Sequence, residues 1–176
     1  DSGIDWIGEI PEEWDVVRVR YISEGIQDGT HGSYLRKEEG IPLLSAKNVT
    51  DAGLNIDTEE SYISCEDACE ITKNGFPRKG DVLFACIGAS IGKTCIYELD
   101  SALPFQRSVA MIRPLNNMVF SSYLSYALKS DFVQQEALAF QNRSTQGGLY
   151  LNLIGELHIA CPPMLEQCNI STYLDK

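Results

Sequence analysis

The sequence predicts a mixed α/β (α+β) fold, in which a single β-rich globular domain with short flanking helices leads into the start of a longer helix. The chain has 176 residues, of which 44% are hydrophobic and 22% charged, enough apolar material for one domain. In the middle of the chain, short apolar runs alternate with glycine-containing turns, a pattern that predicts strands. Two later segments carry apolar residues at helical spacing. No apolar run approaches the ~18 residues of a membrane helix, so we expect no membrane partner.

The N-terminal part of the chain predicts two strands and one helix. Residues 15–22 alternate apolar side chains with two arginines, which is the period of a half-buried strand. The apolar run at residues 41–46 contains Pro42, which places it at a strand start or at a sheet edge. Ser64 precedes an acidic residue at the third helical position, so we expect a capped helix over residues 65–74.

The remainder of the chain predicts a sheet followed by helices. Strands are expected over residues 82–87, 94–98 and 108–113, the first of them central because both of its faces are apolar. Helices over residues 121–129 and 131–140 precede a polar loop at 141–148 and two further strands at 149–153 and 157–160. A last helix begins at Met164 and shows no terminator before Lys176.

Several kinds of chemistry are excluded by spacing. Gly88 and Gly92 precede Lys93 but enclose three residues, whereas a phosphate-binding loop needs four, so this segment predicts a turn with a basic tip. No lysine follows an acidic residue by two positions, as a common metal-dependent nuclease would require. The sequence has two histidines, His31 and His158, but no glycine-flanked serine motif of the kind that supplies the nucleophile of a catalytic triad. We therefore expect no catalytic residue and no cofactor.

The six cysteines predict free thiols rather than a metal site or a disulfide framework. No two of them are separated by the two residues of a zinc knuckle or a redox pair, so we expect no metal. Cys86 and Cys95 lie in apolar runs, where a reduced thiol behaves as a small hydrophobe. Reduced core cysteines are typical of a cytoplasmic protein.

Charge is unevenly distributed along the chain, whose net charge is −11. Residues 1–70 contain 17 acidic and 5 basic side chains, whereas residues 71–113 contain 3 acidic and 6 basic ones. A strongly acidic protein does not favour nucleic acid, because phosphate neutralisation requires Lys and Arg. Only the middle segment is therefore expected to face a polyanion; its cations are Lys73, Arg78, Lys79, Lys93, Arg107 and Arg113.

The order of short motifs along almost the whole chain resembles a target recognition domain of the specificity subunit of type I restriction-modification systems. The motifs are IGEIPEEW at 7–14, DGTH at 28–31, IPLLSAKN at 41–48, GDVLF at 80–84, GASIG at 88–92, QR at 106–107, IRP at 112–114, YL at 123–124, STQ at 144–146 and PPMLEQ at 162–167. Each motif is weak alone, and their common order carries the resemblance.

The resemblance implies a DNA-reading module without catalysis of its own. Residues 1–163 would form the DNA target recognition domain, and residues 164–176 would begin a conserved spacer or coiled-coil helix. The implied partners are double-stranded DNA, DNA methyltransferase (modification) subunits and a restriction/translocase subunit. Such subunits usually carry two recognition domains, so this chain is either a half-length subunit that pairs with a second copy of itself or a fragment.

Candidate DNA-reading residues lie on the predicted loops, because base edges are read by Arg, Lys, Asn and Gln side chains that loops present. Several of them have an alternative role: Asn48 would cap a turn, Lys47 and Lys93 would contact only phosphate, and Gln106 would form a hydrogen bond with the backbone. Arg143 and Gln146 are the favoured base readers, since their loop carries both donors and acceptors beside two glycines. The full set is His31, Lys47, Asn48, Lys93, Gln106, Arg107, Arg143, Thr145 and Gln146.

The acidic composition leaves a second function open. An acidic protein-interaction or DNA-mimicking domain would use the charge of −11 directly. Salt-dependent DNA binding distinguishes the two hypotheses, because a mimic does not bind DNA.

Overall fold

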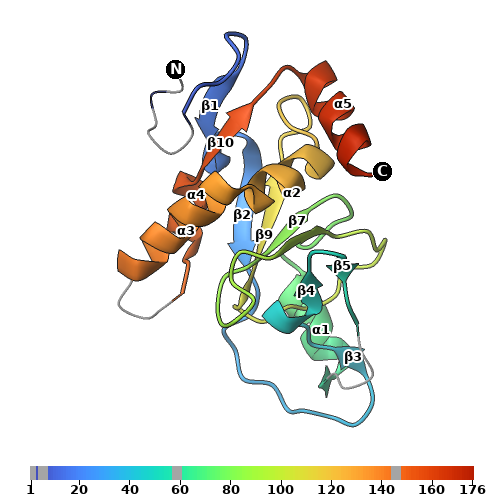
Figure 1. The fold of residues 1–176 in the computed structure, drawn as a ribbon. Coiled ribbons are helices and arrows are strands. Elements are labelled where there is room, and N and C mark those ends of the chain that lie inside the picture. The colour runs from blue at the N-terminus through green and yellow to red at the C-terminus, as the bar shows by residue number, and fades with distance from the viewer. Residues whose placement is uncertain (1–2, 4–7, 57–60, 144–147) are drawn as a thin grey trace.

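The centre of the molecule is a four-stranded antiparallel sheet, seen in a computed structural model that describes residues 3, 8–56, 61–143 and 148–176 (Figure 1). The strand order is β2 (Ser23–Asp28), β9 (Val109–Pro114), β7 (Val82–Ala85) and β8 (Thr94–Ile96). All four residues of β7 are buried. The predicted α+β class and the central position of this strand are confirmed.

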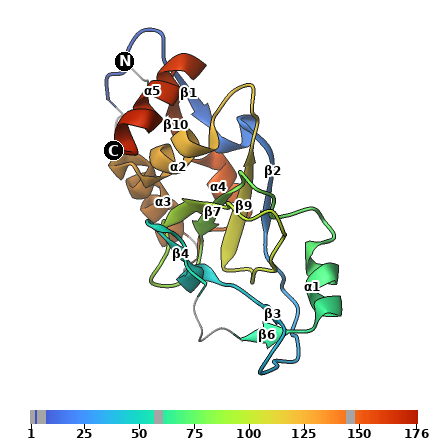
Figure 2. The ribbon, with the colours of Figure 1, turned by 90° about the vertical axis from the view of Figure 1, so that its right-hand side faces the viewer.

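Helices cover one face of the sheet (Figures 1 and 2). They are α2 (Ser121–Lys129), α3 (Asp131–Arg143) and the short α4 (Leu151–Glu156). Alternate residues of β7, such as Phe84, pack against Leu124 and Leu128 of α2 in the main hydrophobic core. Burial of this apolar surface is the principal force that holds the helices on the sheet.

The opposite face of the sheet is covered by the excursion that the chain makes between β2 and β7. Leu83 and Met111 point into a second core with Tyr97 and Phe105, whose rings meet edge to face at 6.2 Å. The elements that the structure describes in this excursion are short, namely β3 (Ile41–Pro42), the 3-10 helix η2 (Ala46–Asn48), β4 (Val49–Thr50), β5 (Gly53–Leu54), β6 (Tyr62–Ile63) and α1 (Cys65–Thr72). Both faces of the central sheet are thus buried.

Both ends of the chain meet in a separate two-stranded sheet. β1 (Asp15–Arg18) pairs antiparallel with β10 (His158–Cys161). The final helix, α5 (Met164–Leu174), packs beside α2. Its buried Gln167 donates from Nε2 to the carbonyls of Met118 and Pro162, both at 2.9 Å. These bonds fasten the start of α5 to the body of the domain.

Three expected strands differ from the structure. The strand expected over residues 15–22 ends at Arg18 and continues as the 3-10 helix η1 (Val19–Tyr21), because Val19 turns into the core and donates its N–H to the Leu157 carbonyl. The strand expected at 41–46 is confined to Ile41–Pro42. The strand expected at 149–153 is wrong, since the chain there begins α4 and buries Ile154 with helical spacing. Within the described ranges, no helix is long and apolar enough to cross a membrane.

Candidate nucleic-acid interface

Several predicted DNA-reading residues gather at one end of the central sheet. The register pairs Asp28 at the end of β2 with Ala110, and Ala85 at the end of β7 with Val109. Phe84 in turn pairs with Thr94, the first residue of β8. The end of β2, the end of β7 and the starts of β8 and β9 therefore lie together, at the lower end of the sheet in Figure 1.

Hydrogen bonds between loops fix the positions of His31 and Arg107 at this end. The Thr30 N–H donates to the Phe105 carbonyl at 2.7 Å, and the Arg107 N–H donates to the Thr30 carbonyl at 3.0 Å. Gly29 is required for this approach, because a Cβ there would collide with the carbonyl oxygens of Phe105 and Gln106. Residues that lie far apart in the sequence are thereby held side by side.

A cavity of about 390 Å³ opens at this sheet end. His31 and Asp28 stand on its lining with a separation of 2.6 Å between Nε2 and Oδ2, and the His31 side chain is 63% exposed. Arg107 lines the same cavity and is exposed. The remaining lining residues are Cys86, Ile87, Gly148, Leu149, Tyr150, Leu151 and Asn152.

The cavity does not supply a thiol nucleophile. Burial raises the pKa of Cys86 to about 12, so its thiol stays protonated near neutrality. Cys86 also donates weakly from Sγ to the Arg107 carbonyl at 3.7 Å. It serves as a packed core residue, as predicted for this cysteine.

Lys93 stands on the turn between β7 and β8. Gly92 has φ +89°, and Gln134 of α3 donates from Nε2 to the Gly92 carbonyl at 3.0 Å, so the turn is fastened to the helix behind it. The Lys93 side chain is exposed. This geometry agrees with a turn that carries a basic tip.

The sequence predicts that the cations of the middle segment form one basic surface. The structure shows that they do not. Arg113 is half-buried and forms a bidentate pair with the buried Asp81, while Lys73 and Lys79 pair with Glu70 and Asp100. In the part of the chain that the structure describes, Lys93, Arg107 and Arg78 form no ion pair. Lys93 and Arg107 lie at the cavity end of the sheet, whereas Arg78 precedes β7 at the opposite end.

Two predicted readers lie on η2 instead of at this sheet end. Asn48 is only 2% exposed; its Oδ1 accepts from the Ser45 N–H and its Nδ2 donates to the Asn55 carbonyl, both at 2.8 Å. It therefore has the capping role that the sequence left open as an alternative to base reading. Lys47 is exposed on the same turn.

The other predicted readers complete this comparison. Gln106 is half-buried and its backbone bridges to Thr30. The predicted placement of Arg143 on a loop is wrong, because α3 continues past Phe140 and Arg143 is its last residue. Thr145 and Gln146 lie outside the described residues. The proposed base-reading role of Arg143 and Gln146 therefore stays a prediction.

Sequence reasoning missed Asn152, an exposed amide on the first turn of α4 that lines the cavity. It was overlooked because residues 149–153 were expected to form a strand. We call Asp28, His31, Lys93, Arg107 and Asn152 together the sheet-end surface. This surface carries donors, acceptors and two exposed cations, the groups that bind phosphates and base edges.

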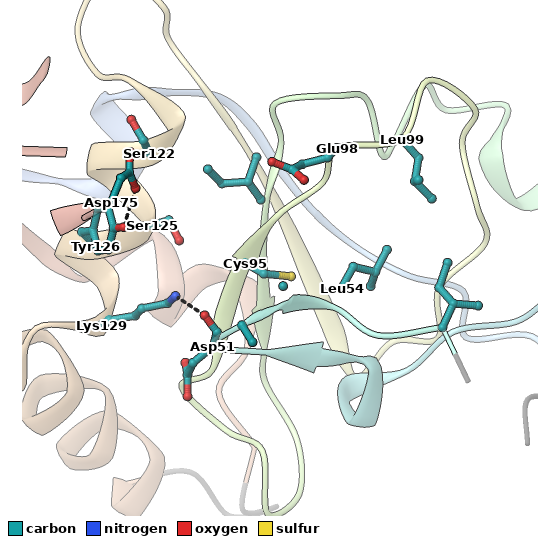
Figure 3. A pocket seen from close by; sticks show the side chains of 14 residues that line it. Asp51, Leu54, Cys95, Glu98, Leu99, Ser122, Ser125, Tyr126, Lys129 and Asp175 are labelled. Atoms are coloured by element: carbon teal, nitrogen blue, oxygen red, sulfur yellow. Dashed lines mark hydrogen bonds between the residues drawn. The ribbon is translucent and has the colours of Figure 1, made fainter. Parts of the chain in front are cut away.

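A second cavity, of about 310 Å³, lies between the β4–β5 hairpin, β8 and α2 (Figure 3). Three of its lining residues are acidic, Asp51, Glu98 and Asp175, and its Lys129 donates from Nζ to the Asp51 carbonyl at 3.1 Å. The Tyr126 hydroxyl donates to Asp175 at 2.6 Å, and this bond raises the pKa of Tyr126. An acidic lining repels phosphates, so this cavity does not suit a polyanion.

Among the residues that the structure describes, no group of three His, Cys, Asp or Glu side chains could hold a metal ion. The six cysteines are free, and Cys86 and Cys95 are buried, as predicted.

Comparisons with known proteins give one consistent result. Residues 11–176 match the family of type I restriction modification DNA specificity domains. A putative type I restriction enzyme MjaX specificity subunit of Methanocaldococcus jannaschii is 29% identical over 173 residues, which span 96% of this chain and 40% of that protein. The chain therefore covers well under half of this relative.

Solved structures share the fold. The HsdS subunit from Thermoanaerobacter tengcongensis aligns with a TM-score of 0.62 at 22% identity, over 96% of this chain and 38% of that one. A chain from a study of complex assembly and conformational transition in the type I R-M system aligns with a TM-score of 0.65 at 22% identity, over 96% of this chain and 39% of its own length. At such identities the likeness concerns the arrangement of the elements.

Proposed function

Because this chain belongs to the family of type I restriction modification DNA specificity domains, we propose that it recognises part of a DNA target through its sheet-end surface. The observation that carries the proposal is that two exposed cations and several polar side chains meet at one end of the central sheet. Arg107 lines the cavity together with His31 and Asn152, and Lys93 lies on the β7–β8 turn at the same end of the sheet. Both cations are exposed and form no ion pair in the described ranges. Of the acidic residues in the N-terminal third, Asp51 lines the second cavity, whereas Asp28 belongs to the sheet-end surface, where its carboxylate stands beside His31.

The sheet-end surface supplies two kinds of contact. Lys93, on a short turn, provides a point charge for a phosphate. Arg107 presents a planar guanidinium whose paired donors match guanine O6 and N7 in the major groove. Phosphate contacts fix the register of the protein on the duplex, and base contacts select the sequence.

The chemistry of restriction and modification would be performed by partners. We place this chain as the specificity component, residues 1–163 as its recognition domain and residues 164–176 as the start of a spacer helix. DNA methyltransferase (modification) subunits and a restriction/translocase subunit would bring the reactions to the site, and a second copy of the chain could read the other part of a split target. The complex would work in the cytoplasm without a cofactor bound to this chain, and magnesium-dependent cleavage by the pure chain would contradict this division of labour.

Salt-dependent DNA binding tests the proposal. The affinity of the chain, alone and assembled with its modification subunits, is measured by filter binding on duplex DNA across a salt series. We expect log K to fall linearly with log salt concentration, and Lys93→Ala to reduce the slope by about one unit. Arg78→Ala, which removes another exposed cation at the opposite end of the sheet, is the matched control and should leave the slope unchanged.

Two outcomes would contradict the proposal. Absence of DNA binding at every salt concentration would favour the acidic protein-interaction or DNA-mimicking alternative. Equal effects of Lys93→Ala and Arg78→Ala would move DNA binding away from the sheet-end surface.

A further inference from the structure

We propose that Asn152 determines specificity by reading an adenine in the major groove, an inference that rests on the proposed function and names one of the bases recognised. Asn152 occupies the second position of α4, after Leu151, and lines the cavity together with Arg107, His31 and Asp28.

The Asn152 amide is available for an external partner. The side chain is exposed, and within the described ranges it makes no hydrogen bond to the protein. This contrasts with Asn48, whose amide oxygen and nitrogen are both used inside the fold. The side-chain amide of a structural asparagine at a turn normally forms hydrogen bonds with nearby backbone groups, whereas the Asn152 amide does not.

The backbone that carries Asn152 is held firmly. The Leu149 N–H donates to the Cys86 carbonyl at 2.9 Å, which ties the entry to α4 to the end of β7. The N–H groups of Leu153 and Ile154 both donate to the Tyr150 carbonyl at 2.9 Å, and Ile154 is fully buried in the main core. A reader mounted on a rigid element loses less conformational entropy on binding than one on a loose loop.

The chemistry of the amide selects the base. The Oδ1 atom accepts a hydrogen bond from the adenine N6 amino group while Nδ2 donates to adenine N7, a bidentate pair that other base pairs do not offer in the same order. Arg107, on the same cavity, offers the corresponding pair of donors to guanine. Asn152 and Arg107, which line the same cavity, would thus read two different purines.

The inference is tested by selecting duplexes from a random library with the chain assembled with its modification subunits. We expect the wild-type protein to enrich a motif, and Asn152→Ala to lose the preference for adenine at one position by about 5- to 150-fold while the other positions keep theirs. Asn152→Gln retains the amide and should keep part of the adenine preference. Asn116→Ala, a change of an exposed asparagine in the loop after β9 at the opposite end of the sheet, is the control and should leave the motif intact.

A chemical variant of the DNA confirms the atom involved. Replacing the adenine by 7-deazaadenine removes the N7 acceptor, so it should weaken binding by wild-type protein and have little further effect on Asn152→Ala. An unchanged motif for Asn152→Ala, or a uniform loss on all sequences, would overturn the inference and leave the proposed function standing. No enriched motif for the wild-type protein would overturn both.

Discussion

The ion pair between the half-buried Arg113 and the buried Asp81 gives a prediction that separates stability from DNA binding. Arg113 donates from Nε to Asp81 Oδ1 at 2.9 Å and from Nη2 to Oδ2 at 2.8 Å, and the Asp81 side chain is only 2% exposed. Arg113 also donates to the Gly75 carbonyl at 2.7 Å and lies 3.9 Å from the centre of the Phe76 ring. Removing Arg113 would leave a buried carboxylate whose remaining bond comes from the backbone N–H of Arg78.

The magnitude follows from the cost of an uncompensated buried charge. We expect Arg113→Ala to lower the free energy of unfolding by about 3–5 kcal/mol. For a chain of this length the melting temperature should fall by roughly 6–20 °C. Lys79→Ala breaks the exposed pair with Asp100 and should cost less than about 1 kcal/mol.

Urea unfolding followed by circular dichroism measures both variants, and filter binding on the folded proteins measures the DNA affinity. Arg113→Ala should leave the salt slope of DNA binding unchanged, because this arginine is already neutralised inside the fold. The reasoning is refuted if Arg113→Ala and Lys79→Ala are equally stable, or if the slope falls by about one unit as expected for Lys93→Ala.

Four further predictions concern buried groups. Burial raises the pKa of Cys86 to about 12 and that of Cys95 to about 11, so a thiol reagent at pH 8 should label these two cysteines only after unfolding. Rapid labelling of either cysteine in the native protein would refute their burial. The exposed thiols that should react at once are Cys65, Cys69 and Cys168. Because of the same pKa shifts, the free energy of unfolding should fall as pH rises from the ordinary thiol pKa near 9 towards 11 to 12, since in that window these two thiols ionise only in the unfolded chain. A urea midpoint that stays constant over this pH range would contradict the prediction. Glu136→Ala should lower the free energy of unfolding in urea by about 1–3 kcal/mol, because the buried carboxylate accepts a hydrogen bond from the His158 backbone N–H at 2.7 Å and stands 2.6 Å from His158 Nδ1. A loss below about 0.5 kcal/mol would show that these bonds contribute little. Gln167→Ala should destabilise the junction of α5 with α2 by about 1–3 kcal/mol, seen as faster amide exchange at the start of α5, and unchanged exchange would argue against this anchor.

Local signals in the sequence predicted those elements whose cause is local. Ser64 caps α1 by accepting the Asp67 N–H at 3.1 Å, and Gly75 beyond the helix has φ +80°, as a helix stop requires. The doubly apolar run of β7 was placed at the centre of the sheet because it must be covered on both faces.

Elements that depend on tertiary contacts were not predictable in the same way. β2 reads Ser-Glu-Gly-Ile-Gln-Asp, with little strand propensity, and forms because β9 provides its hydrogen-bonding partner. Residues 149–153 alternate apolar and polar side chains, yet they turn into α4 because Leu149 bonds to the end of β7 and Ile154 enters the core. The misassignment of this segment concealed Asn152.

The candidate site shows the same division. His31, Lys93 and Arg107 were identified by residue type and loop position, but only strand register shows that they share one end of the sheet. Formal charge could not reveal that Arg113 is neutralised inside the fold, since Asp81 is distant in sequence. A count of basic residues therefore overstates the surface that is available to DNA.

Site-specific cross-linking from two arginine positions tests most directly whether DNA lies on the sheet-end surface. A photoreactive amino acid replaces either Arg107 or Arg78, both exposed residues of the same basic segment at opposite ends of the sheet. The assembled protein is then irradiated on a duplex that carries its selected motif. Efficient cross-linking from position 107 and little from position 78 is the predicted result, and cross-linking from position 78 that equals or exceeds that from position 107 would contradict it.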